Sequence, residues 1–286
     1  MNHTGLPRFR FSLWPRRSFL QWAGLAFPGS TLAFTSSLDH SPAAGDPSAP
    51  DKTQVSDAFP TQSADLAREM VKVSHFDFNR VQQLVEAQPS LARAAWDWGF
   101  GDWETALGAA SHMGNRPIAE YLISKGARPS LFSSAMFGHL DVIKAFISAQ
   151  PGVQRIRGPH GISLLAHAKA GGEASRAVFE FLQSLSDAGG DAPVPLAQAD
   201  IDAILGVYAF GPTDKYRIDV TVENGNLTWT RYGTTGRPLL HLGEQTFYPS
   251  GANSVRIRFS RGQGGMVMTV HDPGLVLTAR KQDTTS

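Results

Sequence analysis

The 286-residue chain contains no cysteine, which excludes disulfide bonds and a lipid anchor of the kind that a lipobox cysteine carries. The absence does not identify a compartment, because an oxidising environment permits disulfides without requiring them. Long apolar runs are missing as well. A moderately apolar stretch, residues 19–34, is interrupted by Gly24, Pro28 and Gly29. It is shorter than the apolar run of about 20 residues that a transmembrane helix needs.

The chain also lacks the motifs of several enzyme classes. It has no S-x-x-K or G-x-S-x-G nucleophile motif, no G-x-x-x-x-G-K-[ST] phosphate loop and no H-E-x-x-H zinc motif. The glycine-rich segment 262–265 lies between two expected strands and indicates a turn. We therefore expect a protein that is not an enzyme and that has no catalytic residues, no cofactor and no metal.

Acidic residues are absent from the beginning of the chain, where the first one is Asp39. Residues 1–38 carry four of the 26 basic residues and none of the 25 acidic ones, so removing them leaves a net charge of −3. A mildly acidic body argues against nucleic acid as a partner, because phosphate binding needs a basic surface.

The same N-terminal region has the layout of an export signal. Residues 15–21 read PRRSFLQ, Arg8 and Arg10 add positive charge upstream, and the apolar stretch follows directly. This segment resembles a twin-arginine export signal, which implies transport of an already folded protein to the periplasm. Membrane contact is then expected only through an uncleaved signal. We assign the signal to residues 1–38 and a Ser-, Pro- and Ala-rich flexible linker to residues 39–64.

The most informative stretch, residues 103–129, reads WETALGAASHMGNRPIAEYLISKGARP. Thr105 can cap a first short helix, Gly114 suits the turn that ends it, and Pro117 is tolerated at the start of a second. Gly126 closes the unit. The pattern resembles one ankyrin repeat, a family of helical repeats that bind other proteins and rarely catalyse reactions.

One repeat cannot bury its apolar face alone, so neighbouring repeats are expected. Weaker matches to the repeat pattern are present on both sides of this unit. Residues 77–92 resemble the second helix and exit loop of an earlier repeat. Residues 130–150 resemble a shortened one, and residues 161–185 a last one. We expect about four units over residues 65–186, followed by a linker at 187–199.

The histidines of this region are expected to be structural. His112, His139, His160 and His167 lie at or near the turns of the expected repeats, and His139 follows Gly138 where ankyrin repeats often carry a structural histidine. A zinc site built from His160 and His167 would need further ligands that the local spacing does not supply.

From Ile201 onward the apolar residues alternate with a period of two, as in β-strands. Residues 216–223 and 227–230 flank Asn224-Gly225, a dipeptide typical of a tight hairpin. Further strands are expected at 237–242, 246–248, 254–260, 266–271 and 275–280. This region, residues 200–281, is expected to form an antiparallel meander that closes or nearly closes, with a tail at 282–286.

Residues 200–281 resemble a small lipocalin-like domain that is appended to some serine β-lactamase-like and peptidase-like proteins. The resemblance rests on Leu205-Gly206-Val207-Tyr208, the hairpin at 224–227, the run 239–242, Phe247-Tyr248 and the strand 255–259. In those relatives the domain is accessory and does not carry the nucleophile, and the catalytic domain that usually precedes it is replaced here by the helical region.

Two sets of aromatic residues are candidate binding sites. The first is a partner-binding set before and within the best repeat, at Trp96, Trp98, Phe100, Trp103 and His112, because tryptophan is enriched at interface hot spots. One or two of these rings are equally compatible with capping the first repeat's core. The second set, at Tyr208, Trp229, Phe247 and Phe259, would line a ligand pocket in the barrel or simply fill its interior.

The sequence therefore predicts an α + β protein with separate domains, a short ankyrin-like helical stack followed by a small antiparallel β-barrel or sandwich. The favoured function is an exported, non-enzymatic adaptor that binds another protein of unknown identity. The alternatives are a periplasmic carrier that binds a small apolar ligand in the β domain, and an enzyme with an unrecognised site between the domains.

Overall fold

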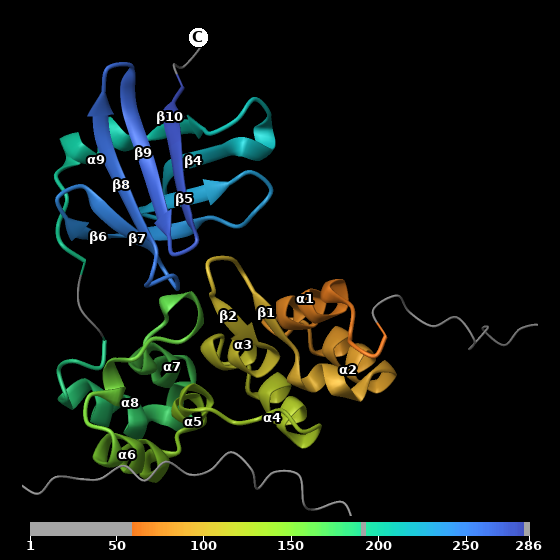
Figure 1. The fold of residues 1–286 in the computed structure, drawn as a ribbon. Helices are drawn as coiled ribbons and strands as arrows, with labels where there is room; N and C mark the ends of the chain where they lie inside the picture. Colours follow the sequence, from red (N-terminus) through yellow and green to blue (C-terminus); the bar gives the residue numbers. More distant parts are fainter. Residues whose placement is uncertain (1–58, 190–192, 283–286) are drawn as a thin grey trace, which may run out of the picture. The chain divides into compact units, whose positions relative to one another are not determined.

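The computed structural model describes residues 59–189 and 193–282 (Figure 1). The expected signal at 1–38, most of the linker at 39–64 and nearly all of the tail at 282–286 lie outside these residues. No helix in the described ranges is long and apolar enough to cross a membrane.

Residues 59–189, the first described range, form four consecutive helix pairs, with a short β-hairpin between the first two pairs. The helices are α1 (Ala64–Val73), α2 (Phe78–Ala87), α3 (Ala106–His112), α4 (Arg116–Ser124), α5 (Leu131–Phe137), α6 (Leu140–Ala149), α7 (Leu164–Ala170) and α8 (Arg176–Ser184). Short 3₁₀ turns, η1 (Pro89–Arg93), η2 (Val153–Arg155), η3 (Pro159–Gly161) and η4 (Gly172–Ser175), connect them.

Side-chain caps start most of these helices. The Thr105 hydroxyl accepts a hydrogen bond from the Gly108 N–H at 2.9 Å, as the sequence predicts. Ser130 and Ser133 form a reciprocal capping box at the start of α5. Gly114 and Gly138 take positive φ angles of 68° and 82° in the turns between paired helices.

The first helix of each pair packs on the first helix of the next, because α3 contacts α1 and α5, and α5 contacts α7. One apolar core joins the first pairs, and its largest buried members are Met70, Leu91, Ile118, Leu122 and Met136. A second core, which includes Ile143, Leu164, Val178 and Leu182, joins the last two pairs. In residues 77–92 the apolar positions Val81, Leu84 and Val85 are core, whereas in α6 only Ile143 is buried and both Val142 and Phe146 are exposed.

The aromatic segment before α3 is a hairpin of β1 (Ala95–Asp97) and β2 (Trp103–Thr105). Trp96 lies opposite Glu104 in its antiparallel register. Gly99, Phe100 and Gly101 all have positive φ angles and form the tight turn. Alternation along β2 leaves Trp103 and Thr105 exposed and buries Glu104, which places a carboxylate inside the protein.

The C-terminal part is a closed barrel of eight antiparallel strands in the order β10-β3-β4-β5-β6-β7-β8-β9, which is compatible with a lipocalin-like barrel. The strands are β3 (Gly206–Ala209), β4 (Arg217–Glu223), β5 (Asn226–Arg231), β6 (Arg237–Gly243), β7 (Thr246–Pro249), β8 (Arg256–Gly262), β9 (Gly265–Asp272) and β10 (Leu275–Lys281), with η5 (Asp214–Tyr216) before β4. The tight turn at Asn224-Gly225 has positive φ angles at both residues, as expected for such a hairpin.

The start of the β region differs from the sequence prediction. Residues expected to begin the period-two pattern instead form helix α9 (Gln198–Ile204). Ile204 is buried in the barrel core, and the Lys281 ammonium donates to the Ala203 carbonyl at 3.0 Å. The helix therefore packs its last turn onto the barrel before the first strand begins.

Side chains fill the barrel interior. Tyr208, Trp229, Phe247 and Phe259 are all buried, and Phe259 packs against Tyr208 and Phe247 with ring centroids 5.6 and 5.5 Å apart. The Tyr208 hydroxyl donates to the Ile204 carbonyl at 2.8 Å. These four rings serve as core, which is the second of the two interpretations that the sequence allows.

Candidate metal centre

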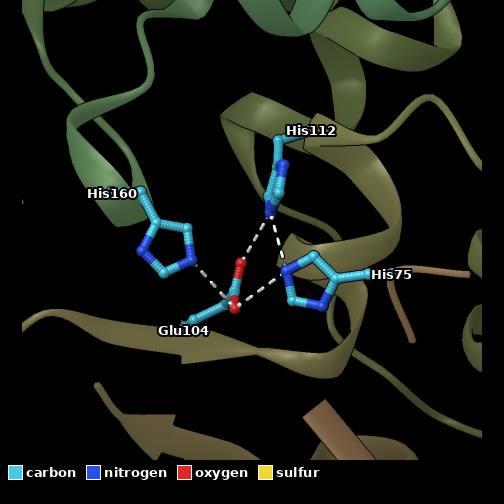
Figure 2. Close-up of side chains that lie close together, drawn as sticks. All are labelled: His75, Glu104, His112 and His160. Atoms are coloured by element: carbon cyan, nitrogen blue, oxygen red, sulfur yellow. Dashed lines mark hydrogen bonds and ion pairs between the residues drawn. The ribbon is translucent and has the colours of Figure 1, made fainter. Parts of the chain in front are cut away.

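Four polar side chains from separate segments meet beside the β1–β2 hairpin (Figure 2). His75 follows the end of α1, Glu104 lies in β2, His112 ends α3 and His160 lies in the turn η3. His75 and His112 are 37 residues apart in sequence, and yet Figure 2 shows all four side chains pointing toward one point. We call these four residues the His₃Glu cluster.

The donor atoms of the His₃Glu cluster are close enough to share one ion. One donor atom from each residue can be chosen such that all four lie within 4.8 Å of one another. His112 Nε2 lies 2.9 Å from Glu104 Oε1 and 3.2 Å from His75 Nε2. Glu104 Oε2 lies 3.3 Å from His160 Nε2 and 3.5 Å from His75 Nε2.

Glu104 is the buried centre of the cluster, with a side chain that is 0% exposed. Trp98 Nε1 donates to its Oε2 at 2.8 Å. Burial raises the pKa of Glu104, but hydrogen bonds from His112 and His160 outweigh burial and lower the pKa to about 2. The carboxylate is therefore ionised at neutral pH and needs positive charge around it.

Backbone carbonyls orient His75. Its Nδ1 lies 3.1 Å from the Val71 carbonyl oxygen and 3.0 Å from that of Lys72. Because a carbonyl can only accept, Nδ1 must carry the proton, and the Nε2 of the neutral ring then presents a lone pair to the cluster. Burial lowers the pKa of His75, which favours this neutral form.

A buried carboxylate orients His160 in the same sense. Its Nδ1 donates to Asp102 Oδ2 at 2.8 Å, and its backbone N–H donates to Asp102 Oδ1 at 2.9 Å. Arg237 Nη1 lies 3.0 Å from Asp102 Oδ2 and balances its charge. A carboxylate behind a histidine is the usual support of a metal-binding imidazole, because it fixes the ring and raises its basicity.

Protons alone do not satisfy this arrangement well. Burial lowers the pKa of His160, but hydrogen bonds to Asp102 and Glu104 raise it to about 9, so without an ion the ring carries a second proton toward Glu104. The single proton on His112 Nε2 must then serve both Glu104 Oε1 at 2.9 Å and His75 Nε2 at 3.2 Å. A cation among the donors would satisfy all of them at once.

The spacing of the donors also suits a metal ion. Bonds of about 2.0–2.2 Å to nitrogen and oxygen place tetrahedral ligands about 3.3–3.6 Å apart and ligands at right angles about 2.8–3.1 Å apart. The four contacts within the cluster span 2.9 to 3.5 Å. These four contacts suit one ion, and the other donor pairs, which lie within 4.8 Å, would close around it when it binds.

A pocket of about 740 Å³ adjoins one side of the cluster. His75 and His160 form part of its wall, together with Trp96, Trp98 and Arg68. The rest of the wall is formed by Asp97 and Gly99 of the β1–β2 hairpin, by residues 233–236 of the β5–β6 loop and by Arg237, the first residue of β6.

The structure places the five expected partner-binding residues in different environments. Trp98 packs on the cluster, with ring centroids 6.5 Å from His75 and 6.2 Å from His160. The ring of Phe100 packs against that of Trp229 in the barrel, with the ring centroids 5.5 Å apart. Trp96 lines the pocket, His112 belongs to the cluster, and Trp103 alone of the five is exposed, at 64%.

Local spacing in the sequence predicts no metal, but it does not take account of residues that the fold brings together. His160 has His75, His112 and Glu104 as its neighbours rather than His167, so the packing of separate segments brings the four side chains together. His139 is exposed and outside the cluster. His167 is structural: its Nδ1 donates to the Ser163 carbonyl at 2.9 Å, and burial lowers its pKa to about 4.

Comparison with known proteins assigns no family to the chain. No model of a known protein family matches the chain, and no curated protein matches its sequence.

Proposed function

We propose that this protein binds a divalent transition-metal ion through His75, Glu104, His112 and His160. The observation that carries the proposal is the orientation of His75. Its Nδ1 proton is committed to two backbone carbonyls, so its Nε2 lone pair faces Glu104 Oε2 and His112 Nε2 inside the protein. An ion at that point turns a poorly satisfied contact into coordination bonds.

The donor set favours some ions over others. Three imidazoles and one carboxylate suit Zn²⁺, Co²⁺, Ni²⁺, Mn²⁺ or Fe²⁺, whereas Ca²⁺ and Mg²⁺ prefer sites made entirely of oxygen ligands. Affinity among the divalent ions should follow the usual order, with Mn²⁺ weaker than Co²⁺ and Zn²⁺. The ion that occupies the site in the cell depends on supply as well as on this order.

Calorimetric titration of the chelator-treated chain tests the proposal. Zn²⁺ and Co²⁺ should each bind with a stoichiometry of one, and Mg²⁺ and Ca²⁺ at the same concentration should give no comparable heat. Binding should release protons, because His160 must give up its second proton to become a ligand. Titrations that show no saturable binding of any transition metal would reject the proposal.

Asp102→Asn should lower the affinity for Zn²⁺ about 10–100-fold, because Asp102 orients His160 without itself belonging to the cluster. The amide has the same shape as the carboxylate but lacks the charge that raises the basicity of the ring. The affinity is measured by competition with a chromophoric chelator, alongside circular dichroism to confirm the fold. Asp219→Asn, which removes a carboxylate on β4, should bind as the unaltered chain does, and equal affinities for all three proteins would remove Asp102 from the account.

A second function, on a different surface, is favoured by the helix pairs and by the exposed indole of Trp103. We propose that the four pairs are ankyrin-like repeats, that the twin-arginine segment exports the chain to the periplasm, and that the helical part there binds another protein. Export of the folded chain is compatible with a metal that is loaded before transport. The carrier alternative has less support, because the four barrel rings that would line a pocket are buried against one another.

Trp103→Ala should leave stability within about 0.5 kcal/mol, because an exposed side chain away from the core contributes little to folding. It should nevertheless reduce the recovery of a partner in affinity purification from periplasmic extract. Tyr232→Ala, which removes a comparably exposed ring from the barrel, is the matched control. If the two variants recover the same proteins in the same amounts, Trp103 does not belong to an interface.

A further inference from the structure

The His₃Glu cluster is closed on one side and open on the other. The side chains of Glu104 and His112 are 0% and 7% exposed, whereas those of His75 and His160 are 19% and 33% exposed. The two more exposed rings are the ones that line the 740 Å³ pocket. An ion in the cluster would thus meet solvent on the side of the pocket.

The number of protein ligands leaves room on that side. The cluster offers three nitrogen ligands and one carboxylate, whereas octahedral ions take six ligands. Sites that act on other molecules keep at least one position for water or substrate, and structural zinc sites close all four. Four protein ligands would fill a tetrahedral site, so the open position on the accessible face belongs to an ion that takes five or six ligands.

The pocket carries positive charge beside that open face. Arg68 lies on α1 in the pocket wall, is exposed, and makes no ion pair within the ranges 59–189 and 193–282. Arg237 also lines the pocket, but it is committed to Asp102 and to the Ser250 carbonyl, to which it donates at 3.1 Å. Among the described residues Asp97 is the one carboxylate in the pocket wall, and its Oδ1 accepts the Gly99 N–H at 2.8 Å.

Uncharged donors complete the recognition chemistry of the pocket. Thr235 of the β5–β6 loop supplies a hydroxyl group, whereas the Thr234 hydroxyl donates to the Arg231 carbonyl at 2.8 Å, and Trp96 and Trp98 supply aromatic walls. Hydroxyls and an available guanidinium bind oxyanions well, because a guanidinium can donate two parallel hydrogen bonds to a carboxylate or a phosphate.

We propose that the pocket binds a small molecule with a carboxylate or phosphate group, which takes an open position on the metal while Arg68 pairs with the anion. This inference rests on the proposed metal site. Binding needs no covalent change: one anion oxygen replaces a water on the ion, and that water leaves to solvent. The ligand is thus an anionic metabolite small enough for 740 Å³, with an apolar or aromatic part that suits the tryptophan walls.

The test uses the full chain loaded with Co²⁺, whose visible absorption reports the coordination of the ion. Inorganic phosphate and acetate are titrated separately, in a buffer that contains neither. At least one of them should shift the Co²⁺ bands in a saturable manner, and the stronger of the two identifies the preferred anion. Arg68→Ala should lower the affinity for that anion about fivefold or more, and it should not alter the Co²⁺ bands before anion is added.

The control and the opposing outcomes separate this inference from the proposed function. Arg258→Ala, which removes an exposed arginine on β8 away from the pocket, should bind the anion as the unaltered chain does. Co²⁺ bands that neither anion changes would overturn the inference and leave the metal site intact. A shift that is identical in Arg68→Ala would remove Arg68 from the site, and the absence of Co²⁺ bands would overturn the metal site and this inference together.

Discussion

His75→Ala is expected to lower the affinity for Zn²⁺ by more than about 100-fold. This loss is larger than the one expected for Asp102→Asn, because Asp102 only orients a ligand. The substitution removes one of three imidazoles, and it removes the ring whose lone pair is most firmly aimed at the cluster. The affinity is measured by competition with a chromophoric chelator on the purified chain. The thermal unfolding temperature of the unaltered chain should rise on addition of Zn²⁺, and that of the variant should not rise at the same concentration.

The matched control is His271→Ala, which removes an exposed histidine from strand β9 of the barrel. It should bind Zn²⁺ as tightly as the unaltered chain. If His75→Ala folds, by circular dichroism, and still binds Zn²⁺ within a factor of a few of the unaltered chain, the ion is held elsewhere and the cluster is not the metal site.

Gly138→Ala should destabilise the helical part by about 2–4 kcal/mol, a large share of the 5–15 kcal/mol that stabilises a typical domain. Gly138 has a φ of 82°, which side chains rarely adopt, and a Cβ at this position would collide with the Ala174 carbonyl oxygen in η4. The α5–α6 turn, which contains Gly138, and η4, which connects α7 to α8, would have to move apart. Urea unfolding followed by circular dichroism measures the loss.

Gly126→Ala separates backbone strain from collision. Gly126 has a similar φ of 92°, but a Cβ there has nothing within 4 Å. Its replacement should cost about 1 kcal/mol, from strain alone. Equal losses for the two variants would contradict the close approach between adjacent helix pairs that the structure shows.

The sequence predicts most of the helical architecture because its signals are local. The cap at Thr105 and the turn at Gly114 depend only on neighbours within one or two turns of chain. The tight hairpin at Asn224-Gly225 is local in the same sense.

The closed barrel and helix α9 are harder to predict. Closure depends on the pairing of β10 with β3, whose residues are about 70 positions apart in the chain. Nothing in the sequence of either strand specifies the other as its partner. Residues 198–204 are helical because the last turn packs Ile204 into the barrel core, which is a tertiary effect that outweighs the weak period-two pattern.

The sequence does not predict the His₃Glu cluster, because no two of its histidines have the spacing of a known motif. One signal was nevertheless present in the sequence. Along β2, Glu104 alternates with Trp103 and Thr105, so a strand with Trp103 outside must bury a carboxylate. A buried carboxylate requires cationic or hydrogen-bonding partners, and His112, eight residues along the chain, is one of them.

The most direct test of the account is a crystal structure of the Zn²⁺-loaded chain with anomalous data collected above and below the zinc absorption edge. The account predicts one strong anomalous peak, about 2.0–2.2 Å from His75 Nε2, His112 Nε2, His160 Nε2 and a carboxylate oxygen of Glu104. A fully loaded crystal with no peak among these four side chains, or with its zinc bound only at His139 or His271, would contradict it.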